Sequence, residues 1–309
     1  MGKRTDVLSF AAKRMIRVPV VLLFVMTVVF GLVHSAGNVV DQLLPPEATA
    51  EQRAELTRQL DLDKPLWAQF GSFLARSLQG DFGFSVFYHS PATSIVLERL
   101  PASLMLAGLS IMVAIGIGLG ILSAVRAGRF ADVLINAVAV LGQSMPSFWL
   151  GQMLILVFAV KFQLLPTSGY NSLAGLVLPT LTLAAFLIPQ ILLLTRTAMI
   201  ESLEQQYMLT AQAKGLPTRL LVFRHGLRNA LNPIIASIGL QLGTLLGGAV
   251  LTESVFGWPG VGRLGVEAIL HRDLPVVVAT VVLLALVVML TNLAVDLLSA
   301  AIDPRVRVS

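Results

Sequence analysis

Residue types that carry catalysis or bind metals are sparse in this chain. The four histidines are His34, His89, His225 and His271, and no two have the short spacing of a metal-binding pair. The sequence contains no Gly-x4-Gly-Lys-Ser/Thr phosphate loop, no His-Glu-x-x-His motif and no Gly-x-Ser-x-Gly turn. It has no cysteine, which excludes disulfides, thiolate catalysis and cysteine-ligated metal. We therefore predict no catalytic residue and no metal site, with a composite site of outward-facing histidines as the alternative.

The composition of the chain indicates whether its structural elements face water or lipid. Hydrophobic residues make up 56% of the 309 residues and charged residues 13%, and the mean hydropathy of +0.82 is far above that of a soluble domain. One soluble core could not bury so much apolar surface. The net charge of +5 could suggest a nucleic-acid partner, but the basic residues are not clustered with aromatic ones as such a surface requires. A membrane protein is predicted.

Six apolar runs are long enough to cross a hydrocarbon core of about 30 Å, which takes roughly 20 residues. Fourteen of the 22 Lys and Arg residues fall in the two termini and two connecting loops, and this bias predicts that both termini are cytoplasmic. We therefore expect an all-α polytopic membrane protein with six transmembrane helices. The six runs are 17–36, 101–125, 133–160, 174–195, 232–252 and 275–301.

The runs divide the chain into three parts. Two amphipathic segments, 50–60 and 67–78, lie in the one sizeable insertion outside the membrane, which is too small for a catalytic domain. The basic residues before the first run also fit a signal peptide cleaved after Ser35, which is the alternative to a retained span. The three parts are a cytoplasmic N-terminus with the first span (1–36), an external subdomain (37–100), and a five-helix core (101–309) with a cytoplasmic coupling loop at 197–231.

Within that cytoplasmic loop the sequence predicts a short amphipathic helix with a defined end. Lys214 lies in the last turn, Gly215 suits the position after a helix, and Pro217 prevents continuation. A capped helix that protrudes from a membrane could be pushed by a partner protein, although a solvated connector can have the same spacing. The apolar face is expected to contain Met199, Leu203, Tyr207 and Ala211.

A second distinctive stretch lies on the outer side between the last two runs. Phe256 and Trp258 flank a glycine, and Pro259-Gly260 forces a turn. The stretch begins with Glu253. A rigid aromatic turn at a pathway mouth could be an outer gate, and an aromatic belt at the membrane interface has the same composition.

A stripe of small residues marks the fifth run. Gly239, Gly243 and Gly247 recur every four residues, with Gln241 between them. Such stripes let helix backbones approach closely, either inside the subunit or at a pathway shared with a partner. Asp296 is the clear intramembrane charge, near the cytoplasmic end of the last run. An ion-driven carrier would normally need midplane carboxylates or broken helices, and neither is visible.

Several stretches, taken in order, resemble one known family. Thr-Ala-Gln-Ala-Lys-Gly at 210–215 and the following 225–233 segment resemble the EAA loop of permease subunits in ATP-binding-cassette (ABC) importers, and most closely those of the peptide/nickel branch. Two departures are Leu209, where the general motif has glutamate, and Ala36-Gly-Asn-Val39, where the branch usually reads Gly-Asp-Pro. Further similar segments are Leu-Asp-Lys-Pro-Leu at 62–66, Gly-Asp-Phe-Gly at 80–83, 251–262, and Asp-Pro-Arg at 303–305.

The resemblance implies a subunit that forms half of a translocation pathway for short peptides in a bacterial inner membrane. It implies a second homologous permease, two cytoplasmic ATPase subunits that hold ATP and Mg, and an extracytoplasmic substrate-binding protein, with no cofactor or covalent chemistry in this chain. It favours a gate or binding-protein contact for the outer turn. Glutathione-like peptides, nickel chelates and haem also fit the branch. An ion-driven carrier and a membrane-embedded enzyme are the competing classes. The residues implied in coupling are Leu203, Tyr207, Thr210, Ala211, Ala213, Lys214, Gly215, His225 and Arg228.

Overall fold

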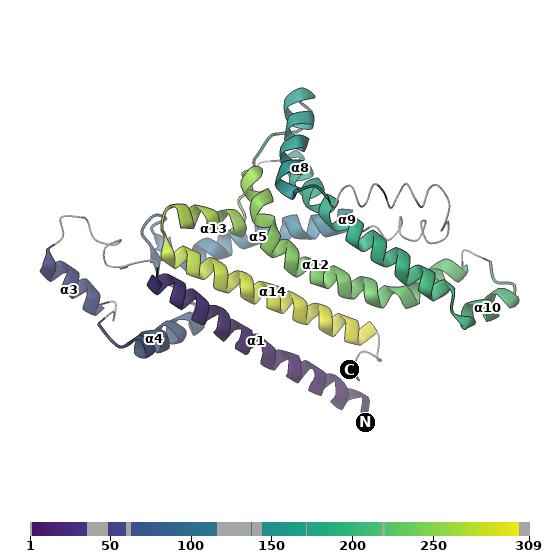
Figure 1. Cartoon of the computed structure of the whole chain (residues 1–309), viewed down its shortest axis with the longest axis horizontal. Helices are drawn as coiled ribbons and strands as arrows, with labels where there is room; N and C mark the ends of the chain where they lie inside the picture. Colours follow the sequence, from purple (N-terminus) through teal and green to yellow (C-terminus); the bar gives the residue numbers. More distant parts are fainter. Residues whose placement is uncertain are drawn as a thin grey trace. The chain divides into compact units, whose positions relative to one another are not determined.

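Long apolar helices dominate the computed structural model (Figure 1). The model describes residues 2–35, 49–59, 63–115, 137, 144–170, 172–217 and 220–302. In these ranges, four helices are long and apolar enough to cross a membrane, and a fifth candidate is bent by 53° between Pro233–Leu245 and Ala249–Val255. The chain is therefore an all-α polytopic protein. The long helices are α1 (Gly2–Ser35), α5 (Ala92–Ala114), α9 (Leu173–Leu203), α12 (Leu227–Val255) and α14 (Leu274–Ile302).

The expected third span, 133–160, is not one continuous helix. Ser144 and Met145 lie in a turn before Pro146, and α8 (Ser147–Leu154) begins only after that proline. A proline disfavours helical backbone in the residue before it, which explains the interruption. The α8 helix continues into the π-helix η1 (Ile155–Lys161). The remainder of the expected third span, apart from residue 137, and the second span beyond 115 lie outside the described residues.

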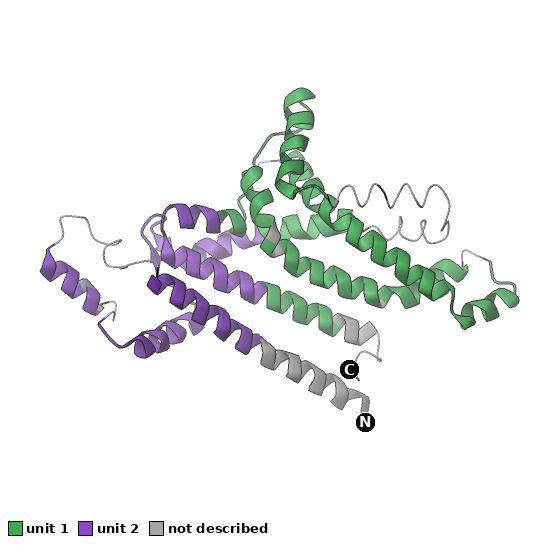
Figure 2. Ribbon diagram, viewed as in Figure 1, with its two compact units in different colours: residues 1–13, 102–263, 288–309 green, residues 14–101, 264–287 purple. Residues whose placement is uncertain are grey.

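The chain separates into two compact units (Figure 2). Unit 1 comprises Met1–Lys13, Ala102–Arg263 and Val288–Ser309, and unit 2 comprises Arg14–Pro101 and Leu264–Val287. In unit 1, α12 packs along α9. The buried residues of one unit 1 core are Ala198, Met199, Val222, Ala230 and Ile234.

Two of the three glycines in the α12 stripe pack inside unit 1. A Cβ atom on Gly239 would overlap the Val295 side chain of α14, and one on Gly243 would lie 3.3 Å from Cγ1 of Val288. Gly247 has no neighbour within 4 Å of such an atom. Gly239 and Gly243 therefore let helices pack closely inside this subunit, whereas Gly247 lies on an open face of this chain.

These contacts predict different outcomes for two alanine substitutions in the same helix. Gly239→Ala should lower the free energy of unfolding by about 1–3 kcal/mol, because the added methyl group overpacks the helix contact. Gly247→Ala is the matched control and should be neutral or slightly stabilising, because alanine favours helix over glycine. Thermal unfolding of the purified protein in detergent measures both. Equal melting temperatures for the two variants would contradict the α12–α14 contact.

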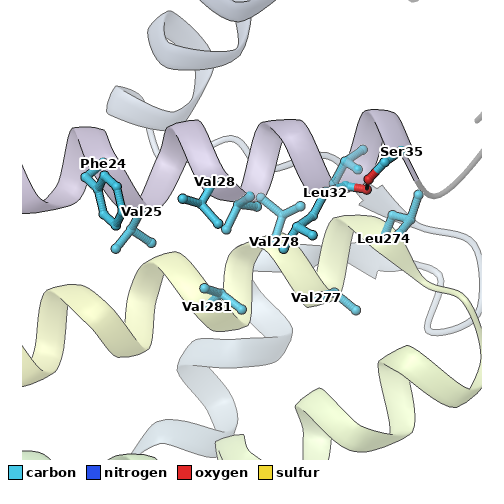
Figure 3. A pocket seen from close by; sticks show the side chains of 11 residues that line it. Phe24, Val25, Val28, Leu32, Ser35, Leu274, Val277, Val278 and Val281 are labelled. Carbon is cyan, nitrogen blue, oxygen red and sulfur yellow. Dashed lines mark hydrogen bonds between the residues drawn. The ribbon is translucent and has the colours of Figure 1, made fainter.

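Unit 2 contains the described part of the 37–100 segment. Its helices α3 (Ala50–Gln59) and α4 (Leu66–Leu78) confirm the two amphipathic segments expected there. Phe30 of α1 packs edge-on against Phe70 of α4, with ring centroids 5.2 Å apart. The first half of α14 packs on α1 through a core of Met26, Val29, Val278 and Val282. Between the same two helices runs an apolar groove of about 570 Å³ (Figure 3).

A short hairpin follows α4 within unit 2. Strands β1 (Phe84–Ser85) and β2 (Ser90–Pro91) pair antiparallel, and the Ser85 hydroxyl donates to the carboxylate of Asp273 before α14. Tyr88 donates to Glu267 with 3.4 Å between the oxygens. Burial and then the nearby Glu267 carboxylate raise the pKa of Tyr88, so its hydroxyl remains a proton donor at neutral pH.

Candidate functional site

The short helix expected in the 197–231 loop exists, but it is separate from the helix before it. The α9 helix ends at Leu203, and α10 (Gln206–Ala213) begins after a break at Glu204 and Gln205 (Figure 1). Gly215 has φ +75° and its amide donates to Gln212 O at 2.9 Å. This left-handed residue is the predicted helix stop, since glycine adopts that backbone without steric cost.

The break makes the predicted apolar face of this segment wrong. Helical spacing cannot be continued across 204–205, and Tyr207 does not lie on the inward side with Leu203 and Ala211. The buried residues of α10 are instead Met208 and Ala211, which pack against Leu221, Leu203 and Leu216. The opposite side of α10 is exposed and consists of Gln206, Leu209, Thr210 and Ala213.

Tyr207 anchors α10 to its own subunit through a polar network. Its hydroxyl lies 2.9 Å from Ser202 Oγ and accepts a hydrogen bond from Asn229 Nδ2 at 2.7 Å. It also donates to the Ser202 carbonyl at 3.2 Å, and Ser202 Oγ donates to Gly226 O at 3.0 Å. The network joins the end of α9, α10 and the start of α12. The network therefore ties α10 to two long helices.

Ser202 and Asn229 carry this network, and neither was predicted as a site residue. Their signal in the sequence is weak, because Ser202 is simply a polar residue near a helix end and Asn229 follows a basic stretch. His225 and Arg228 were predicted to act beside the coupling helix. His225 lies half-buried in the π-helix η2 (Leu221–Gly226), and Arg228 is exposed at the start of α12. Lys214 is exposed directly after α10.

The outer turn is packed inside unit 1. Trp258 has 0% of its surface exposed, Glu253 1% and Phe256 2%. Pro259 is half-buried and Gly260 is buried. A side chain with no exposed surface cannot face lipid headgroups, so the Trp258 ring does not form part of an interfacial aromatic belt. Nor do the buried side chains offer a surface for direct contact with another protein in this arrangement.

Hydrogen bonds hold the turn against the part of α5 that belongs to unit 1. Trp258 Nε1 donates to Ala102 O at 3.0 Å, and the Trp258 amide donates to Glu253 O at 2.8 Å. The Ser103 hydroxyl donates to Glu253 Oε1 at 2.6 Å. Tyr170 packs edge-on against Trp258, with ring centroids 4.9 Å apart. Ser103 was not predicted, because nothing in its local sequence indicates a partner 150 residues away.

The described ranges contain no candidate metal-binding cluster. No group of three or more His, Cys, Asp or Glu residues in them could hold a metal ion. Gln241 accepts a hydrogen bond from Thr244 Oγ1 one turn later, at 3.0 Å. A small cavity of about 230 Å³ lies in unit 1 between α8, α9 and α12. It is lined by Ser147, Leu183, Phe186, Leu187, Thr244, Leu245 and Leu251.

Comparison of the sequence with known proteins finds membrane components of transport systems. The family model described as binding-protein-dependent transport system inner membrane component matches residues 116–308. The glutathione transport system permease protein GsiC of Escherichia coli (strain K12) is 40% identical over 303 residues, which cover 97% of this chain and 99% of that protein. GsiC of Salmonella typhimurium (strain LT2) is similar to the same extent.

Solved structures share the fold. The MetNI methionine ABC transporter in an inward-facing conformation matches with a TM-score of 0.59 and 21% identity, over 68% of this chain and 96% of that one. An amino acid ABC transporter with histidines matches with a TM-score of 0.51 and 16% identity, over 69% and 94%. From the family match and the full-length identity, this chain belongs to the binding-protein-dependent transport system inner membrane components, as a permease subunit of an ABC importer in the peptide/nickel branch.

Proposed function

We propose that this chain forms half of the pathway through which an ABC importer moves short peptides, glutathione-like peptides among them. The observation that carries the proposal is the 40% identity to a glutathione transport system permease across 97% of this chain and 99% of that protein. Sequence similarity that covers both chains end to end supports a shared role as well as a shared fold. Nickel chelates and haem are the other substrate classes to be tested.

The other half of the pathway is proposed to be a second, homologous permease. A permease of this family works with an ATPase and a substrate-binding protein, and two ATPase subunits with their ATP and Mg would dock on the cytoplasmic side. The chain would supply no covalent chemistry. Its task would be to convert closure of the ATPases into a change of access to the pathway.

The α10 helix is the proposed docking element for an ATPase. Leu209 is 63% exposed, and it lies beside the exposed Thr210 and Ala213 on the side opposite the buried Met208. An apolar side chain held outward on a rigidly anchored helix is suited to enter a groove on a partner. Gly215, Lys214, His225 and Arg228 are proposed to frame this contact.

The pathway itself is proposed to run beside α12. Gly247 leaves an open face there, and the cavity between α8, α9 and α12 has apolar walls with the hydroxyls of Ser147 and Thr244. A peptide has a polar backbone and arbitrary side chains, so a path with weak neutral contacts suits it. The packed turn at Glu253–Gly260 is proposed to close the outer end.

The proposed topology has cytoplasmic termini, a cytoplasmic segment 197–231 and an external segment 37–100. Single cysteines at Gln79 and Gln212 in this cysteine-free chain should therefore react with an impermeant maleimide from opposite sides of the membrane. Both positions are exposed, whereas Ser202 is buried and unsuited to labelling. Labelling of both cysteines from the same side of intact cells would contradict the topology.

The function is tested with the complete transporter. The complex of this chain with its second permease and ATPases is reconstituted into vesicles, and ligands that copurify with the binding protein are identified by mass spectrometry. Uptake of labelled glutathione or a dipeptide that needs both ATP and the binding protein supports the proposal. Uptake by this chain alone, driven by an ion gradient, would refute it.

A further inference from the structure

Glu253 holds a buried carboxylate whose two oxygens both accept hydrogen bonds from the protein. Its Oε1 accepts from the Ser103 hydroxyl at 2.6 Å, and its Oε2 accepts from the Arg263 amide at 3.0 Å. The Gly262 amide is a further backbone donor to this carboxylate. Buried charged groups are costly unless they are paired or fully hydrogen-bonded. A carboxylate kept in this position therefore indicates a defined structural task.

The donors identify that task as the capping of a helix. The α13 helix (Val261–Leu270) begins where the outer turn ends, and its first amides have no partner inside the helix. The Val261 amide donates to Ser103 Oγ at 2.8 Å, and the next two donate to Glu253. The positive end of the α13 dipole lies against the carboxylate and offsets its charge. The cap thus comes from α12 and α5 and not from the residue before α13.

Gly260 is required by the same carboxylate, and Gly262 by that carboxylate together with the α12 backbone. A Cβ atom on Gly260 would overlap the Glu253 carboxylate, and one on Gly262 would lie 2.9 Å from Oε2 and 2.8 Å from Val250 Cα. The Arg263 guanidinium closes the turn from the other side by donating to Gly257 O at 2.5 Å. Only residues without a side chain leave room for this arrangement.

We propose that Glu253 is a positioning residue that, through Ser103, clasps the outer turn and the first turn of α13 to the part of α5 in unit 1, so that they move as one rigid body. The outer end of the pathway then opens by displacement of this whole body, and the turn does not swing away from α5 as a separate flap. The inference rests on the proposed function only in taking this turn as the outer end of the pathway.

The first test measures the clasp without substrate or ATP. In the assembled transporter, Trp67→Phe and Trp149→Phe leave Trp258 as the one tryptophan of this chain, because the sequence contains three, and the partner subunits are made tryptophan-free. Glu253→Ala and Ser103→Ala should each raise quenching of Trp258 by acrylamide and speed hydrogen exchange of the 261–263 amides roughly tenfold, because buried donors lose their acceptor. Glu253→Gln keeps one acceptor oxygen and should have a smaller effect.

Ser254→Ala is the matched control, because this exposed neighbour bonds only to Val250 O within its own helix. It should leave quenching and exchange unchanged. If Ser103→Ala and Glu253→Gln both behave as this control does, the clasp is refuted, even where Glu253→Ala fails to fold.

The second test separates rigid-body movement from a flap. Ser103 Oγ lies 2.8 Å from the Val261 amide, so the two residues are in contact, and cysteines are placed at both positions and oxidised. Reduced Ser103→Cys/Val261→Cys transporter should lose transport, and the oxidised form should regain most of it, because the covalent bond replaces the clasp. Loss of transport on oxidation, with recovery on reduction, would overturn the proposal in favour of a flap. Transport by the unmodified complex tests the proposed function separately.

Discussion

Replacing Leu209 by aspartate is expected to abolish ATP-driven uptake while leaving the chain inserted in the membrane. Leu209 is the large apolar side chain that α10 holds outward, and docking would remove it from water. An unpaired charge in such a contact costs about 3–5 kcal/mol, which corresponds to a loss of roughly two to four orders of magnitude in affinity for the ATPase. Binding-protein-stimulated ATP hydrolysis and vesicle uptake measure the loss.

Gln212→Asp is the matched control for the charge. Gln212 is exposed on the same helix but is already polar, so its replacement should reduce stimulated hydrolysis only slightly. Copurification of the ATPases with each variant separates failed docking from failed coupling. Wild-type uptake by the Leu209→Asp transporter would mean that α10 is a connector with no docking role.

The end of α10 could be predicted from the sequence, but its buried face could not. Gly215 was predicted as the stop from the residues around it, and its φ of +75° confirms that local rule. Four-residue spacing carried on from Met199 and Leu203 of α9 predicts an apolar face that includes Tyr207. The break at 204–205 shifts the inward positions to Met208 and Ala211. Tyr207 instead bonds Ser202 and Asn229, and contacts made by folding leave no periodic signal.

In the outer turn, too, the local backbone could be predicted from the sequence and the tertiary contacts could not. The Pro259-Gly260 turn follows from residue types alone, whereas the burial of Trp258 depends on Ala102 and Ser103, about 150 residues earlier. The prediction of a continuous third span over 133–160 is wrong for a local reason, because Pro146 interrupts the run. The run is apolar over its whole length, so hydropathy alone predicts an uninterrupted span despite this one proline.

Gly260→Ala is expected to be the most damaging small substitution in the outer turn. Its Cβ would overlap the Glu253 carboxylate, which is buried and held by hydrogen bonds to both oxygens. Overpacking of this kind costs about 1–3 kcal/mol, and displacing the carboxylate from its donors would add roughly 1–3 kcal/mol more. The melting temperature of the purified transporter and the quenching of Trp258 should both report the change. Gly108→Ala, on α5 with no neighbour within 4 Å, is the control and should be neutral.

A double-mutant cycle with Glu253 tests whether the carboxylate is the cause. If the Gly260 methyl group collides with it, truncating Glu253 to alanine removes the collision, and Gly260→Ala should then have little further effect. The losses of the two single variants would exceed that of the double variant by roughly 1–3 kcal/mol, the coupling expected of residues in direct contact. Additive losses would instead place the Gly260 clash elsewhere in the turn. The size of the coupling therefore decides whether Gly260 is kept for a bend in the backbone or for the carboxylate that the turn encloses.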